Sequence, residues 1–150
     1  MNGLRKLIAY LPGGIMAEIG CFSGESTAEF AGKFGHVFAI DTWGGGFHES
    51  DLSVEQVFDL RMSAFGNVAK KKMRGHDAAA DLSDAFLDFV YIDAIHLYDS
   101  VLQDIRDWTP KIKGGGHIGG HDYCPEWPGV IQAVDEVFGR PDIVFEDSSW

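Results

Sequence analysis

The segment from Ile15 to Asp41 constrains the fold of this chain more than any other. An apolar run leads into Glu18, a turn of small residues follows as far as Gly24, and a helical stretch begins near residue 25. A second apolar run ends on Asp41, 17 residues after Gly24. Proteins that bind a nucleoside-bearing cofactor have this order of elements, namely strand, glycine turn, helix, strand and acid. Glycines there let the ligand approach the backbone, and the acid can bind both ribose hydroxyls.

The turn from Glu18 to Gly24 has the pattern E-x-G-x-x-x-G. Dinucleotide-binding turns instead have the pattern G-x-G-x-x-G, which places the pyrophosphate at a helix N-terminus. The spacing here therefore favours a cofactor without phosphates, of which S-adenosylmethionine is the common one. An NAD(P)-dependent reductase is the less favoured alternative, because its characteristic turn is absent from the sequence.

The rest of the chain alternates short apolar runs with stretches of helical periodicity. Such alternation predicts a parallel sheet with helices on both faces. We therefore expect one α/β domain over residues 1–150, with a Rossmann-like, doubly wound, mostly parallel sheet in a three-layer αβα sandwich. The predicted strands are 16–20, 36–41, 71–74, 86–93, 117–121 and 143–145, the predicted helices are 4–11, 26–34, 54–65, 78–85, 98–108 and 129–138, and a glycine-rich loop is predicted at 42–50.

Four segments, in this order, resemble the class I S-adenosylmethionine-dependent methyltransferases. They are the turn at 18–24, the acid segment Ile40-Asp41-Thr42-Trp43, the segment 88–98 with its I-D-x-x-H-x-Y pattern, and the segment 114–123, which ends in G-H-D-Y. The last two are similar to the subgroup of macrocin O-methyltransferase-like enzymes, which methylate sugars and antibiotics. The resemblance implies methyl transfer to an oxygen of a sugar or another small hydroxylated acceptor.

The resemblance also implies which residues bind the cofactor. The turn would hold its methionine end, the acid segment its ribose, and the residues after the third strand its adenine. The expected cofactor-binding residues are Glu18, Gly20, Ser23, Gly24, Asp41, Thr42, Trp43, His76, Asp77 and Asp93. Several of them have structural alternatives. Gly20 and Gly24 could serve only the packing of helix against strand, and Glu18 could be a structural acid at a strand end. Trp43 could belong to the core, and Asp41 or Asp77 could cap a helix.

Two histidines and two aspartates fall at the predicted carboxyl ends of neighbouring strands, where ligands bind in open parallel sheets. They are Asp93, His96, His121 and Asp122. In one mechanism, His96 or His121 is the general base that takes the proton of the acceptor hydroxyl, and an aspartate orients the imidazole. The candidate catalytic residues are therefore His96, His121 and Asp93.

In a second mechanism, Asp93 and Asp122 bind Mg²⁺ or another divalent cation, with a histidine as a further ligand. The metal would hold two acceptor oxygens and lower the pKa of the hydroxyl group. Relatives that use a metal often carry another carboxylate or an asparagine beside these positions, where this chain has Ile95 and Tyr123. That departure weakens the metal hypothesis but leaves both mechanisms open.

Composition limits the partners. The net charge of −11 argues against nucleic acid and anionic membranes as partners, because both bind basic surfaces. No apolar run approaches the ~20 residues that span a bilayer. The two cysteines, Cys21 and Cys124, suit reduced thiols in a cytoplasmic protein. We expect a small-molecule acceptor as the partner.

Two features depart from the family that the chain resembles. Residues 147–150 look like the turn into a final antiparallel strand, which is then missing, truncated or replaced. The long N-terminal extension that often builds the acceptor pocket or a dimer interface is also lacking. Acceptor recognition would therefore depend on loops or on the second subunit of a homodimer. A domain that binds the cofactor or a metal without catalysis is the non-enzymatic alternative.

Overall fold

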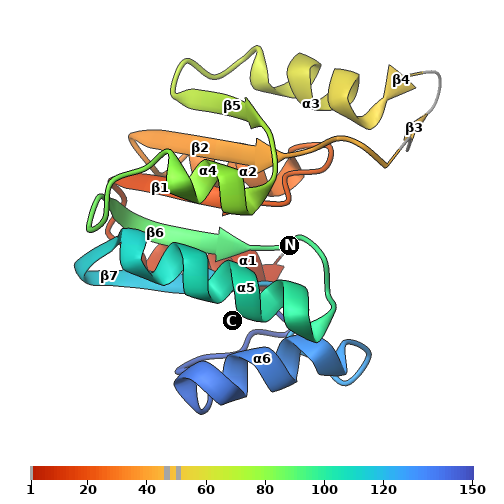
Figure 1. Ribbon diagram of the computed structural model, residues 1–150. Helices are drawn as coiled ribbons and strands as arrows, with labels where there is room; N and C mark the ends of the chain where they lie inside the picture. Colours follow the sequence, from red (N-terminus) through yellow and green to blue (C-terminus); the bar gives the residue numbers. More distant parts are fainter. Residues whose placement is uncertain (1, 46–47, 50–51) are drawn as a thin grey trace.

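The computed structural model describes residues 2–45, 48–49 and 52–150. Its centre is a five-stranded parallel sheet in the order β5-β2-β1-β6-β7 (Figure 1). The strands are β1 (Ile15–Ile19), β2 (His36–Asp41), β5 (Val68–Lys72), β6 (Leu87–Ile92) and β7 (Ile112–Gly120). Outside this sheet, β3 (His48–Glu49) and β4 (Leu52–Ser53) pair with each other in an antiparallel ladder.

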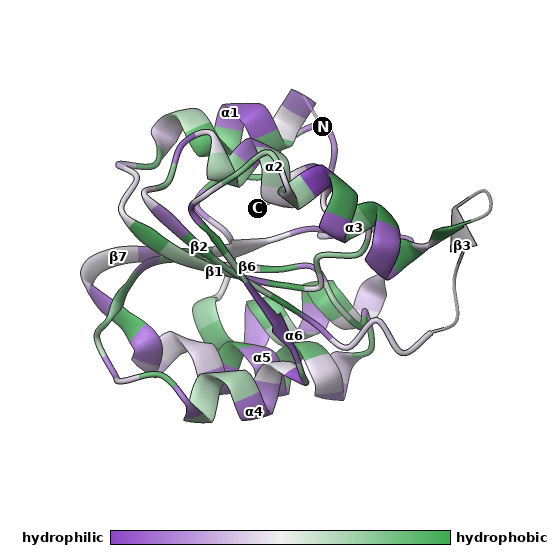
Figure 2. Cartoon of the chain, turned by 90° about the horizontal axis from the view of Figure 1, so that it is seen from above, coloured by the Kyte–Doolittle hydropathy of each residue, from purple (hydrophilic) through white to green (hydrophobic). Residues whose placement is uncertain are grey.

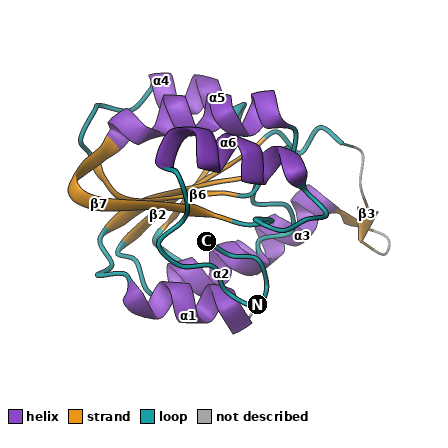
Figure 3. Ribbon diagram, turned by 90° about the horizontal axis from the view of Figure 1, so that it is seen from below, coloured by secondary structure: helices purple, strands orange, loops and turns teal. Residues whose placement is uncertain are grey.

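Helices cover both faces of the sheet (Figures 2 and 3). One layer contains α1 (Asn2–Tyr10), α2 (Glu25–Ala31) and α3 (Val54–Met62), and the other contains α4 (Gly75–Ala80), α5 (Tyr98–Trp108) and α6 (Pro128–Phe138). A short 3₁₀ helix, η1 (Thr109–Lys111), follows α5. The expected doubly wound, three-layer α/β fold is confirmed.

Apolar side chains on alternating positions of the strands build a separate core on each face. On β1, Met16 packs with Phe30 of α2. Ala17 and Ile19 instead belong to the core that contains Trp108 of α5. Both faces of β1 are therefore buried, as expected for a parallel sheet that is covered on each side. This packing fixes the carboxyl ends of the strands relative to one another.

The chain reverses its progress across the sheet beside β1. From β1 it moves outward to β2 and β5, and it then returns to the other side of β1 for β6 and β7. Ile19 is in register with Ile40 on one side and Ile92 on the other. The carboxyl ends of β1 and β6 thus form a topological switch point, and ligands of open α/β sheets bind in the crevice at such a point.

The third strand of the sheet lies earlier than predicted. β5 spans residues 68–72 rather than 71–74, because its lysines conceal it from a pattern based on hydrophobicity. Lys70 lies 2.8 Å from Glu55 and 2.6 Å from Asp59, both on α3. The charge of the strand is therefore compensated by the helix that covers it.

Two neighbouring boundaries also differ from the prediction. Since β5 ends early, α4 begins at residue 75 and ends at residue 80, whereas the predicted helix spans 78–85. The predicted loop 42–50 contains β3, and its residues 46, 47 and 50 lie outside the described part of the chain. No helix among the described residues is long and apolar enough to cross a membrane.

Residues 143–145, which were predicted as a sixth strand, do not form one. The chain instead turns back at Asp147, whose carboxylate accepts a hydrogen bond from the backbone N–H of Leu4 at 2.9 Å. Trp150 then pairs with Gly120 at the end of β7, through backbone N–H···O distances of 2.9 and 3.1 Å. The apolar run that suggested a strand stays partly exposed, and Trp150 takes the position beside β7.

Candidate active site

An open cleft of about 1270 Å³ lies at the carboxyl ends of β1, β2, β5 and β6. Six of the ten expected cofactor-binding residues line this cleft, namely Gly20, Asp41, Thr42, Trp43, His76 and Asp93. The other four, Glu18, Ser23, Gly24 and Asp77, are not among its lining residues. The structure thus collects residues from four separate segments around one cavity, which we call the cofactor cleft.

Asp41 organises the backbone around the cofactor cleft. Its Oδ2 atom accepts hydrogen bonds from the backbone N–H groups of Cys21 and Phe22, each at 3.0 Å. Its Oδ1 atom accepts a hydrogen bond from the backbone N–H of Trp43 at 2.8 Å. One carboxylate therefore ties the glycine turn after β1 to the segment after β2, and it remains at the wall of the cleft.

Gly20 brings the glycine turn close to the end of β6. Its φ angle is 90°, in the left-handed region that glycine adopts without steric cost. A Cβ atom at this position would lie 2.0 Å from the backbone carbonyl oxygen of Asp93. Any larger residue would therefore push Asp93 out of place, and the turn and Asp93 remain adjacent only because residue 20 is a glycine.

Glu18 lies beneath the turn and is fully buried. The hydroxyl groups of Ser26 and Thr27 donate hydrogen bonds to its two carboxylate oxygens, with Thr27 at 2.5 Å. Burial raises the pKa of Glu18 to about 7, although the two hydroxyl groups oppose this shift. The carboxylate therefore joins β1 to α2, and a direct contact between Glu18 and the cofactor stays a prediction.

Ser23 also has a partner from a distant part of the chain. The guanidinium group of Arg61, on α3, donates to the backbone carbonyl of Ser23, and it lies 3.1 Å from the side-chain Oγ atom. This contact fastens α3 over the glycine turn. Sequence reasoning did not identify Arg61, because nothing local to its helix indicates which loop it reaches.

Trp43 lies between the cleft and the core, and its contact with the cofactor stays a prediction. It lines the cofactor cleft, and its indole N–H donates to the backbone carbonyl of Phe22 at 2.9 Å. Its ring also packs against Phe58 of α3 at a centroid distance of 4.8 Å. The ammonium group of Lys70 lies 4.7 Å from the centre of the same ring. These contacts hold one face of the cleft rigid.

The two residues predicted to contact adenine lie in different environments. His76 lines the cofactor cleft, and its Nδ1 atom is 2.9 Å from a carboxylate oxygen of Asp107. This hydrogen bond raises the pKa of His76. Asp77 is exposed in the first turn of α4, outside the cleft lining. The structure therefore brings His76 to the cleft but not Asp77.

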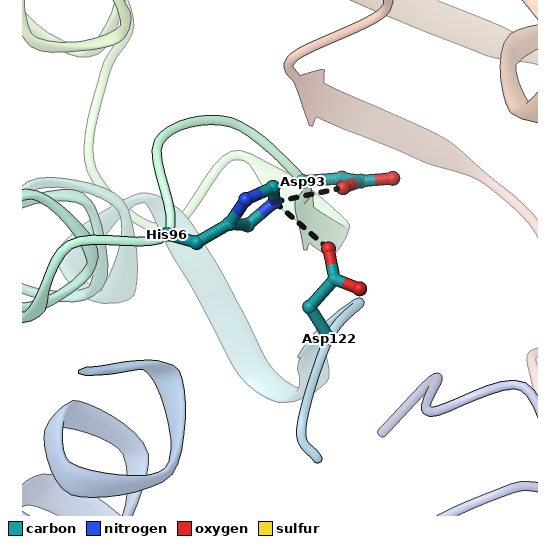
Figure 4. A group of neighbouring side chains, drawn as sticks. All are labelled: Asp93, His96 and Asp122. Atoms are coloured by element: carbon teal, nitrogen blue, oxygen red, sulfur yellow. Dashed lines mark ion pairs between the residues drawn. The ribbon is translucent and has the colours of Figure 1, made fainter. Parts of the chain in front are cut away.

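Three of the residues predicted for catalysis or metal binding meet at the rim of the sheet (Figure 4). His96 Nε2 lies 2.8 Å from Asp122 Oδ2 and 3.7 Å from Asp93 Oδ1. His121 Nδ1 lies 3.1 Å from the other oxygen of Asp122. We call Asp93, His96 and Asp122 the rim cluster. The carboxylate of Asp93, followed by the charge of Asp122, raises the pKa of His96, although desolvation opposes the shift.

The rim cluster has the composition and spacing of a metal site. One ligand atom from each of its three residues can be chosen so that all lie within 4.8 Å of one another. His96 Nε2 is buried and makes no hydrogen bond within the described part of the chain, and its contacts with Asp122 and Asp93 are ion pairs. An imidazole nitrogen between two carboxylates matches the ligand types of Mn²⁺, Fe²⁺ or Zn²⁺. These residues therefore fit a divalent cation.

A second pocket of about 490 Å³ adjoins the cofactor cleft. The two cavities share Gly20, Phe22, Asp93 and Ala94. The lining of the second pocket also includes His96 and His121, as well as Leu4 and Asp147 from the two ends of the chain. Of the rim cluster, Asp93 therefore lines both cavities and His96 lines the second pocket, while Asp122 supports them from outside the two linings. No sequence signal indicated that Leu4 and Asp147 would lie here, because only the folded chain brings them together.

A model of the protein family described as "Methyltransferase domain" matches residues 17–123. This match covers the glycine turn, Asp41 and the whole rim cluster. The chain belongs to the methyltransferase domain family. The methyltransferase domain identified in this way includes all the residues that line the cofactor cleft. A search of curated protein sequences gave no match.

Solved structures of a decarboxylase and of methyltransferases have the same fold. The precorrin 8w decarboxylase of Methanobacterium thermoautotrophicum is 20% identical, with a TM-score of 0.68 over 90% of this chain and 70% of that one. The TDP-rhamnose 3'-O-methyltransferase of calicheamicin biosynthesis is 18% identical, with a TM-score of 0.63 over 92% of this chain and 68% of that one. The phosphoethanolamine N-methyltransferase 1 of Haemonchus contortus, solved with S-adenosylhomocysteine, is 17% identical, with a TM-score of 0.66 over 83% and 26%.

Proposed function

We propose that this methyltransferase domain transfers the methyl group of S-adenosylmethionine to a hydroxyl oxygen of a small acceptor such as a sugar, as the macrocin O-methyltransferase-like subgroup does. The observation that carries the proposal is the position of the rim cluster. Its histidine lies 2.8 Å from Asp122 and 3.7 Å from Asp93. His96 lines the second pocket, and Asp93 lines both that pocket and the cofactor cleft.

The cofactor cleft suits S-adenosylmethionine in both shape and chemistry. Asp41 is at the end of β2 and reaches the wall of the cleft, where a carboxylate can bind two ribose hydroxyl groups. The turn at Gly20 leads to Asp93 and the rim cluster, so the sulfonium methyl group belongs at that end. The turn has no glycine triplet for a pyrophosphate, which supports this cofactor over NAD(P).

The second pocket suits the acceptor, because it adjoins the cofactor cleft at Asp93. His96 and His121 both line it. The ring of His96 also packs against Trp127 at a centroid distance of 4.4 Å, and 43% of Trp127 is exposed. Trp127 is not among the residues that line the second pocket, but it stands beside His96, which does. An exposed aromatic ring beside polar groups offers an acceptor both an apolar surface and hydrogen bonds. A sugar ring presents that combination.

The proposed reaction is a direct displacement at the methyl carbon. The acceptor oxygen attacks this carbon, the bond from carbon to sulfur breaks, and its electron pair stays on sulfur, which yields S-adenosylhomocysteine. The hydroxyl proton passes to the neutral imidazole of His96 or His121. A well-placed base contributes a factor of about 10² to 10⁴ in rate. Alignment of oxygen, carbon and sulfur also lowers the barrier, because binding has already removed the translational freedom that the reaction would otherwise have to remove.

A metal-assisted form of the same reaction is the second candidate. Asp93, His96 and Asp122 would hold the divalent cation, and the cation would lower the pKa of a bound hydroxyl group. The buried, non-hydrogen-bonded Nε2 atom of His96 favours this candidate. In that case His121, which lies beside Asp122, is the remaining histidine that can accept the proton.

The experiment measures methyl transfer to a panel of sugar nucleotides and small polyols by wild type, His96→Ala and His121→Ala, with and without EDTA. If a histidine is the base, its alanine variant loses about 10²- to 10⁴-fold in kcat and EDTA has no effect. If the cluster holds a metal, EDTA abolishes turnover and Mn²⁺ or Mg²⁺ restores it. His117→Ala is the matched control, because His117 is exposed outside both cavities.

Two results would contradict the proposal. Full activity of both alanine variants would exclude the rim histidines from the reaction. Tight binding of S-adenosylhomocysteine without turnover on any acceptor would support the alternative of a cofactor-binding domain that has lost catalysis.

We further propose a cytoplasmic protein without nucleic-acid or membrane partners, and a homodimer in which a second subunit completes the acceptor pocket. Light scattering tests the homodimer directly.

A further inference from the structure

Asp104 is a carboxylate of the cofactor cleft to which the site described above gives no role. It lies on α5 one turn from both Val101 and Trp108, which are buried, so it interrupts the apolar stripe of this helix. Its side chain lines the cofactor cleft. Among the described residues, none forms a hydrogen bond or an ion pair with it. A carboxylate in such a position is costly unless a ligand satisfies it.

The carboxylate of Asp104 stands beside the start of α4. A Cβ atom on Gly75 would lie 3.2 Å from Asp104 Oδ1 and 3.1 Å from the side chain of Ile19. The absence of a side chain at Gly75 therefore keeps this part of the cleft open. Ile40 and Met73 also line it, so a polar group stands at the edge of an apolar floor. This combination suits a flat heteroaromatic ring with a polar edge.

The order of the strands indicates which part of the cofactor reaches Asp104. The rim cluster follows β6 and β7, Gly20 follows β1, Asp41 ends β2, and Gly75 follows β5. A cofactor with its methyl group at the rim cluster and its ribose at Asp41 extends its base toward β5. The base then lies over the apolar floor, next to Gly75 and Asp104.

We propose that Asp104 accepts a hydrogen bond from the 6-amino group of adenine and thereby selects adenine over 6-oxo purines. This inference rests on the proposed use of S-adenosylmethionine. Burial, and then the negative charge of Asp107, raises the pKa of Asp104 to about 7. Both the ionised and the neutral carboxyl group keep an oxygen that can accept from an amino group. Only the ionised form has no proton to donate to a 6-oxo group, so the selection of adenine belongs to the ionised form, above about pH 7.

The chemistry of discrimination follows from the donor and acceptor pattern of the base. Adenine presents an amino group at position 6, whereas hypoxanthine presents a carbonyl oxygen there. That oxygen would face the ionised carboxylate of Asp104, and two acceptors would be left unpaired in a partly desolvated site. Sites that are built around one hydrogen bond reject analogues that lack it much more strongly than apolar pockets reject a missing methylene.

The test is calorimetric titration, above about pH 8 so that Asp104 is ionised, of S-adenosylhomocysteine and S-inosylhomocysteine into wild type, Asp104→Asn, Asp77→Asn and Asp81→Asn. Wild type should prefer the adenosyl compound by at least about 10-fold. In Asp104→Asn the side-chain amide can donate to the 6-oxo group, so the preference should fall by at least about 10-fold. Asp81→Asn should keep the wild-type preference, because Asp81 is an exposed residue at the C-terminus of α4.

Each result decides the inference. An unchanged preference in folded Asp104→Asn, or a change in Asp77→Asn instead, would overturn it in favour of the adenine contact expected from the sequence. Circular dichroism establishes whether the variants fold. If Asp104→Asn does not fold, the wild-type comparison still decides, because equal binding of the two compounds by wild type also overturns the inference.

The failure of this inference can be distinguished from failure of the proposed function. If wild type binds neither compound, both the use of S-adenosylmethionine and the role of Asp104 are wrong. If wild type binds S-adenosylhomocysteine and Asp104→Asn leaves the preference unchanged, only the role of Asp104 is wrong.

Discussion

Replacing Glu18 with glutamine should change how the stability of this protein depends on pH. Glu18 is fully buried beneath the glycine turn, and burial raises its pKa from 4.5 to about 7. Between these values the folded protein holds a proton that the unfolded chain releases. The contribution of Glu18 to the unfolding free energy is therefore fully present below about pH 4.5 and is lost as the pH rises through about 7.

The size of the effect follows from the shift in pKa. One pKa unit corresponds to about 1.36 kcal/mol. A group with a pKa of 4.5 in the unfolded chain and about 7 in the folded protein therefore removes about 2.5 kcal/mol of stability between pH 5 and pH 8. In Glu18→Gln the side chain is neutral at every pH. Its amide can still bond with the hydroxyl groups of Ser26 and Thr27, so this loss should be absent.

The assay is urea unfolding of wild type and Glu18→Gln at several pH values from 5 to 8. The difference between the two unfolding free energies removes the contributions of other titrating groups, which both proteins share. This difference should move by about 2.5 kcal/mol in favour of glutamine as the pH rises. Glu25→Gln is the matched control, because the Glu25 side chain is 59% exposed. Parallel curves for wild type and Glu18→Gln would refute the reasoning.

Three further substitutions test the construction of the cleft. Asp41→Asn removes the carboxylate that is proposed to bind the ribose, and it weakens the backbone hydrogen bonds of the turn. Titration should therefore show at least about 10-fold weaker binding of S-adenosylhomocysteine, and thermal unfolding should show a loss of about 1–3 kcal/mol in stability. Gly20→Ala places a methyl group against Asp93 and should abolish binding in the same titration, whereas Gly66→Ala, which has open space, should not. Trp150→Ala empties a buried site and should cost about 3–5 kcal/mol in urea unfolding; a cost below about 1 kcal/mol would show that Trp150 does not hold the end of the chain against β7.

The fold and the cofactor cleft could be predicted because their signals are local. The glycine turn needs residues that tolerate a left-handed backbone and close approach, and Gly20 adopts that backbone. Asp41 ends an apolar strand at a fixed distance from the turn. Parallel strands bring their carboxyl ends to one edge, so the approach of Asp93 and Asp122 to His96 also followed from the strand order.

The features that could not be predicted depend on contacts between distant segments. β5 carries lysines that are acceptable in a strand only because α3 supplies Glu55 and Asp59. The run at 143–145 has strand character, but the bond between Asp147 and Leu4 directs the chain elsewhere. In the sequence, Asp104 is only an acid within the apolar stripe of a helix. Its proposed role in the cleft depends on the position of Gly75, which the sequence does not reveal.

The second pocket, which we propose holds the acceptor, has a consequence for how such a domain changes its acceptor during evolution. All residues that line the cofactor cleft lie within the matched segment 17–123, whereas Leu4 and Asp147 of the second pocket lie outside it. Because Asp147 binds the backbone of Leu4, these two flanking segments form one structural unit. They should covary between relatives, and exchanging both together should change the choice of acceptor while cofactor affinity stays constant.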